Sequence, residues 1–215
     1  MSKSFTADGT NWAIEYDVEP IRIRDPVAEA LAVLDPGEPF VIHYRDVVTT
    51  AGHSCPTAAG AFRITQVGLD ALYPDTLPVR SEIEVRAGGP KDDAAYGVMA
   101  RLVSEITGAA GADGFGGLAG GYGGRDDLLG YGEFGTGGVQ FGFRRTDTDD
   151  AVLVTYHVAD VPDLGPAGQY LPRLVDGRAT EEEREAFAKG WHGRVQAVLD
   201  TEDLFSVERV EELPE

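Results

Sequence analysis

Half of the glycine in this chain is concentrated in one segment. Residues 108–138 hold 14 of the 28 glycines, and large apolar side chains such as Phe115, Tyr122 and Phe134 interrupt them. Glycine destabilises the interior of helices and strands, so we expect the regular elements to lie before and after this segment. Flexible linkers lack large apolar side chains at this density. We therefore predict a long ordered loop that lies over the functional site, as a lid or as part of a dimer contact. The segment contains no Gly-Lys-Ser or Gly-Lys-Thr and follows no strand of a Rossmann-like unit, so its glycines do not indicate a phosphate-binding loop.

The patterns on either side of the glycine-rich segment predict an α+β fold, with a mixed or antiparallel sheet packed with helices. Apolar and polar residues alternate over Trp12–Val18, which is typical of a half-buried strand. Asp25 followed by Pro26 predicts the start of a helix that continues to Leu34, and Phe40–Tyr44 reads as a short strand. We further expect helices from Thr57, over Asp92–Ile106 and from Thr180, and strands over Arg80–Arg86, Val139–Arg145 and Ala151–Val158.

The only cysteine of the chain lies in the run Ala51–Ala61. Cys55 stands two residues after His53 and directly before Pro56. Proline suits the first position of a helix, which places Cys55 at the helix start, where backbone N–H groups and the helix dipole favour a thiolate. A thiolate with an imidazole nearby can bind a soft or borderline metal ion or act as a nucleophile activated by a base. A single cysteine can equally be a small buried side chain that only packs.

Three other histidines are weaker candidates. His43 and His157 follow or end predicted strands and are candidates for further metal ligands. His192 lies beside Trp191, at the edge of the predicted buried stripe of the C-terminal helix, and we interpret it as a residue at the boundary of the core.

The sequence Gly-His-Ser-Cys-Pro followed by a helix of small residues resembles the His-x-Cys-Pro-Gly signature of the formylmethanofuran dehydrogenase E-type family. The resemblance covers about residues 40–160, and its specific part is Gly52–Pro56. It implies that His53 and Cys55 bind a transition metal, commonly zinc. Family members usually carry a further cysteine after the Thr-Gly turn, whereas Thr107-Gly108 is followed here by two alanines. No cysteine follows Cys55, so a cysteine-rich zinc finger is excluded.

The resemblance divides the chain into three parts. Residues 1–39 form an N-terminal strand–helix extension, residues 40–160 a metal-site domain similar to that of the family, which contains loop 108–138, and residues 161–215 a C-terminal connector, helix and acidic tail. The function it implies is a metal-binding protein, in one form a metal-dependent enzyme acting on an unidentified small molecule. The alternatives are a metal-free thiol enzyme, with Cys55 as nucleophile and His53 as base, and a non-catalytic accessory or metal-carrier component of an oxidoreductase.

The charge excludes one class of partner. The chain has 37 acidic and 18 basic residues, for a net charge of −19, and a surface of this kind repels nucleic acid. Acid-rich, lysine-poor chains are typical of proteins that work in molar salt, so we expect a halophilic protein. The sequence has no apolar run of 18 residues and no signal peptide, which predicts no membrane span and a cytoplasmic location. We also expect a homodimer, because the signature supplies few ligands and the glycine-rich segment carries many apolar side chains.

Overall fold

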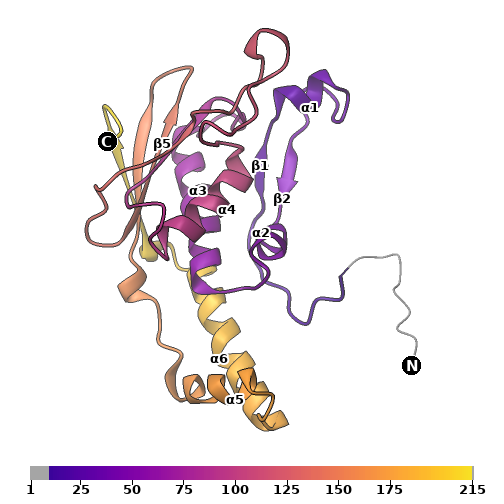
Figure 1. Ribbon diagram of the computed structural model, residues 1–215, viewed down its shortest axis with the longest axis vertical. Helices are drawn as coiled ribbons and strands as arrows, with labels where there is room; N and C mark the ends of the chain where they lie inside the picture. The colour runs from indigo at the N-terminus through magenta and orange to yellow at the C-terminus, as the bar shows by residue number, and fades with distance from the viewer. Residues whose placement is uncertain (1–9, 215) are drawn as a thin grey trace.

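A mixed sheet of five strands forms the centre of the protein in the computed structural model, which describes residues 10–214 (Figure 1). The strand order is β4-β3-β5-β6-β7, and only the β3–β4 pair is parallel. The strands are β3 (Ile83–Ala87), β4 (Leu129–Tyr131), β5 (Val139–Arg145), β6 (Ala151–Tyr156) and β7 (Phe205–Val210). This arrangement of helices on a mixed sheet confirms the predicted α+β fold.

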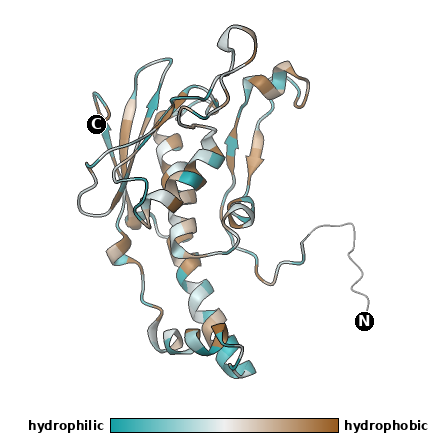
Figure 2. Ribbon diagram, in the orientation of Figure 1, coloured by the Kyte–Doolittle hydropathy of each residue, from teal (hydrophilic) through white to brown (hydrophobic). Residues whose placement is uncertain are grey.

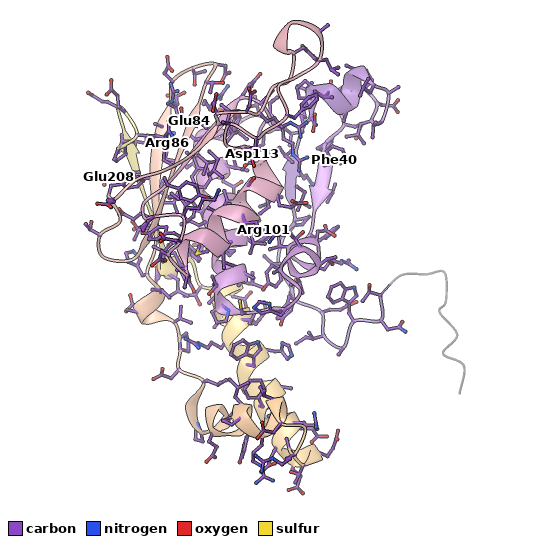
Figure 3. The ribbon with its side chains drawn as sticks, viewed as in Figure 1. Phe40, Glu84, Arg86, Arg101, Asp113 and Glu208 are labelled. Carbon is purple, nitrogen blue, oxygen red and sulfur yellow. The ribbon has the colours of Figure 1, made fainter. Side chains whose placement is uncertain are left out.

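Helices α3 (Pro56–Leu72) and α4 (Tyr96–Thr107) cover one face of the sheet (Figure 1). The strands turn fully buried side chains towards them, among them Phe141 and Phe143 on β5. The other face is polar, because successive side chains of a strand point to opposite sides. There the buried carboxylate of Glu84 pairs with Arg86 and Arg144. Figure 3 shows Glu84 and Arg86 together on the sheet.

The N-terminal part of the described chain forms a small layer beside α3 and α4. Strand β1 (Ile21–Ile23) pairs antiparallel with β2 (Phe40–Ile42), and α1 (Pro26–Ala30) and α2 (Tyr44–Ala51) follow these two strands. Asp25 caps α1, as predicted, and its Oδ1 accepts hydrogen bonds from the backbone of Val27 and Ala28. The helix ends at Ala30 and not at Leu34, because Ala32 takes a left-handed conformation with φ 55°.

Two strand predictions in this region need correction. Segment Trp12–Val18 alternates in burial as expected but has no strand partner. Side-chain amides bind its backbone instead: Gln196 donates to the carbonyl of Asp17. Strand β2 ends at Ile42, and not at Tyr44, because the next residues begin α2, where the N–H of His43 donates to Asp46 Oδ2 at 2.8 Å.

The C-terminal part consists of a helical arm and the last strand. Helix α6 (Glu181–Asp200) begins at the predicted capping box of Thr180 and Glu183. Beside it lie α5 (Leu171–Val175) and the 3-10 segment η3 (Gly165–Tyr170), and together they extend away from the sheet (Figure 1). Figure 2 shows that hydrophilic residues dominate the far end of this arm. The chain then returns through η4 (Glu202–Leu204) to add β7 at the edge of the sheet; η2 (Val158–Asp160) follows β6.

The glycine-rich segment departs from its prediction in two ways. It contains β4 and the 3-10 turn η1 (Ala119–Gly121), so it supplies an edge strand of the sheet. Its middle part packs against α1 and not over Cys55: Arg125 pairs with Asp25 at 2.5 Å, and the hydroxyl of Tyr122 donates to the carbonyl of Pro26. In Figure 1 this part lies near α1, at the opposite end of α3 from Cys55. Over residues 10–214, no helix is long and apolar enough to cross a membrane.

Candidate functional site

Cys55 occupies the position that the sequence predicts, at the start of helix α3. It is the N-cap residue, with φ −153°, and Pro56 takes the first helical position. Its Sγ accepts a hydrogen bond from the N–H of Ala58 at 3.4 Å. The side chain is partly buried against the core. The thiol therefore faces unpaired backbone N–H groups of a long helix, an environment that attracts negative charge.

His53 lies in the turn that joins α2 to α3. Helix α2 ends at Gly52, which has φ 77°. The imidazole of His53 is exposed, and its Nδ1 lies 3.1 Å from the carbonyl oxygen of Ala51. A carbonyl oxygen only accepts hydrogen bonds, so this contact assigns the proton to Nδ1 and leaves the lone pair of Nε2 unoccupied. Metal-binding and basic histidines are commonly oriented in this way.

Ser54, between the two candidate residues, is held by aromatic side chains from three elements. Its Oγ lies 3.0 Å from the hydroxyl of Tyr44, and its carbonyl accepts a hydrogen bond of 2.8 Å from Trp191 Nε1. The ring of Tyr16 packs edge-on against Tyr44 at 5.2 Å, and its hydroxyl lies 2.5 Å from His192 Nδ1. Burial raises the pKa of both tyrosines and lowers the pKa of His192, so all three side chains are neutral near pH 7.

Tyr156 closes the other side of this turn. Its hydroxyl donates to the carbonyl of Pro56 at 3.4 Å, and its ring stacks on Phe205 at 4.9 Å. Burial raises the pKa of Tyr156 as well. The backbone on both sides of Cys55 is thus fixed by the sheet, by α2 and by α6.

Sequence analysis did not find most of this surrounding shell. Ser54 stands inside the signature, and the pair Trp191-His192 was the only distant signal. Nothing in the sequence pointed to Tyr16 or Tyr44, which lie on different segments.

The two other candidate ligands lie elsewhere. His43 precedes α2. His157 follows β6, and its Nε2 lies 2.9 Å from Ser206 Oγ. Across residues 10–214, no three His, Cys, Asp or Glu side chains form a group that could hold a metal ion. His53 and Cys55 provide one imidazole and one thiolate, donors that zinc accepts, but they amount to half of a tetrahedral set.

The chain matches no protein-family model and no curated protein. The fold and the site therefore define its class: an α+β protein with a histidine–cysteine pair at the start of a central helix. The resemblance to the formylmethanofuran dehydrogenase E-type family stays a prediction.

Proposed function

We propose that this protein binds a transition metal ion, zinc in the first instance, through Nε2 of His53 and Sγ of Cys55. The observation that carries the proposal is the contact between His53 Nδ1 and the carbonyl of Ala51 at 3.1 Å. That contact fixes the tautomer in which Nε2 can bind a metal, and a hydrogen bond of this kind also raises the basicity of a ligating imidazole.

A second copy of the chain completes the site in this proposal. Structural zinc takes four ligands, and two copies would supply two imidazoles and two thiolates. His53 is exposed, which leaves its Nε2 accessible to a neighbouring copy. Two-fold dimers are the commonest closed assembly, and a two-fold axis through the ion relates two identical ligand pairs.

The test is the metal content of protein purified without a histidine tag. We expect about one metal ion per two chains in the wild type, and none in His53→Ala or Cys55→Ser. His157→Ala is the matched control, since His157 contacts Ser206 and belongs to a different surface. Light scattering in molar KCl should show a dimer that a strong chelator dissociates.

The outcomes separate the parts of the proposal. One metal ion per chain in a monomer would retain the two ligands but contradict the shared site. Protein without metal after reconstitution with zinc, or metal retained in both site variants, would refute the metal proposal.

A second function has support from a different observation. Because residues 10–214 contain no group of three metal-type ligands, the site can instead operate as a metal-free thiol site. Cys55 at the N-terminus of α3 would be the nucleophile and Nε2 of His53 the base. Rapid alkylation of chelator-treated protein near neutral pH, slowed in His53→Ala, is the expected result. Slow alkylation that this substitution does not change would contradict it.

A further inference from the structure

A hollow of about 110 Å³ lies between the segment Trp12–Val18 and helix α2. Three aromatic side chains line it, Trp12, Tyr16 and Tyr44, together with aliphatic side chains that include Ile14 and Val48. Trp12 stands at 36% exposure in this lining. A volume of this size is comparable with the cavity of about 150 Å³ that admits benzene in another protein. The hollow therefore fits one ring and not a larger ligand.

Charged groups lie at the same hollow. Arg45 and His43, at the start of α2, contribute to its lining, and Glu15 does so from the N-terminal segment. Among residues 10–214, Arg45 forms no ion pair, although the chain has about twice as many acidic as basic residues. An arginine of this kind, beside aromatic rings, is suited to a planar anion, because its guanidinium can donate two parallel hydrogen bonds to a carboxylate.

We propose that this hollow binds a small aromatic monocarboxylate, of the benzoate class. The ring packs among Trp12, Tyr16 and Tyr44, and the carboxylate pairs with Arg45. Glu15 carries the same charge as the ligand and disfavours a second carboxylate, so the site selects monoanions.

The hollow adjoins the candidate site but is independent of a metal ion. Tyr44 lines the hollow with its ring and contacts Ser54 Oγ with its hydroxyl. Tyr16 likewise reaches from the hollow to His192. A bound ring would thus lie one layer of side chains from Cys55, and its binding does not require the ligands of the proposed metal site.

The test is a titration of chelator-treated protein with benzoate, in molar KCl, by calorimetry. The chain has two tryptophans, so Trp191→Phe leaves Trp12 as the only indole fluorophore and reports on the hollow directly. We expect saturable binding with one site per chain by both methods. Arg45→Gln should weaken binding about tenfold or more, because a hydrogen-bonded charge is lost, and Glu15→Gln should strengthen it.

The matched control is Arg22→Gln. Arg22 is an exposed arginine on β1 that forms no ion pair within residues 10–214, so its substitution changes the net charge equally at a distance from the hollow. Equal loss of affinity in Arg22→Gln and Arg45→Gln would overturn the proposal, as would wild-type protein that shows no saturable binding. Benzamide that binds as tightly as benzoate would overturn the role of the carboxylate, and cyclohexanecarboxylate that binds as tightly would overturn the role of the aromatic ring.

Discussion

Helix α3 and strand β6 approach each other most closely at Gly60, and this contact gives a sharp prediction. A Cβ atom at Gly60 would lie 2.4 Å from Cε1 of Tyr156. The ring of Tyr156 is 1% exposed and stacks on Phe205, so it has no space to move aside. Gly60→Ala must therefore push the helix and the strand apart.

The magnitude follows from two opposing effects. Alanine stabilises a helix interior by about 1 kcal/mol relative to glycine. Overpacking of a well-packed core costs about 1–3 kcal/mol, and a contact below 3 Å against a fixed ring belongs in the upper half of that range. We expect Gly60→Ala to lower the free energy of unfolding by about 1–2 kcal/mol. In Gly193→Ala, on α6, nothing lies within 4 Å of the added methyl group, so this matched variant should gain about 1 kcal/mol.

Urea denaturation in molar KCl measures both variants on the same scale. They should differ by about 2 kcal/mol or more, which corresponds to a factor of roughly 30 in the folding equilibrium constant. If Gly60→Ala were as stable as the wild type while Gly193→Ala gained stability, the close packing of α3 on β6 would be wrong.

Much of the fold could be predicted because its signals are local. The starts of α1, α3 and α6 combine a capping side chain with proline or glutamate within a few residues, and all three lie where the sequence places them. Strand β4 could not be predicted in this way. Its parallel pairing with β3 joins Leu129 to Val85 across the sequence, and a glycine-rich segment gives no periodic signal for it. Segment Trp12–Val18 shows the reverse case: its periodicity predicted burial correctly, but periodicity alone does not specify a sheet partner.

The candidate site could be predicted only in part for the same reason. The helix start at Cys55 follows from adjacent residues. The groups that surround it come from elements far apart in sequence: Trp191 lies 137 residues from Ser54, and His192 lies 176 residues from Tyr16. These contacts depend on the packing of α6 against α3, which side-chain patterns within a single helix do not determine.

Three further predictions concern charge. The melting temperature should rise between dilute buffer and molar KCl, because salt screens the repulsion of a net charge of −19; an unchanged melting temperature would contradict the halophilic character. Asp25→Ala should lower the free energy of unfolding by about 3–5 kcal/mol, because it leaves the guanidinium groups of Arg125 and Arg80 without their buried carboxylate, whereas Asp46→Ala, at an exposed cap, should cost about 1 kcal/mol. The last prediction concerns pH. Burial lowers the pKa of His192 below its ordinary 6.5, so below that pH the unfolded chain binds more protons than the folded chain, and the contribution of His192 to stability falls as the pH falls. Urea denaturation between about pH 7.5 and 5.5 should therefore show a steeper loss of stability in the wild type than in His192→Asn. Parallel profiles would mean that His192 can accept a proton in the folded protein without cost, which its contact with Tyr16 and its burial beside Trp191 argue against.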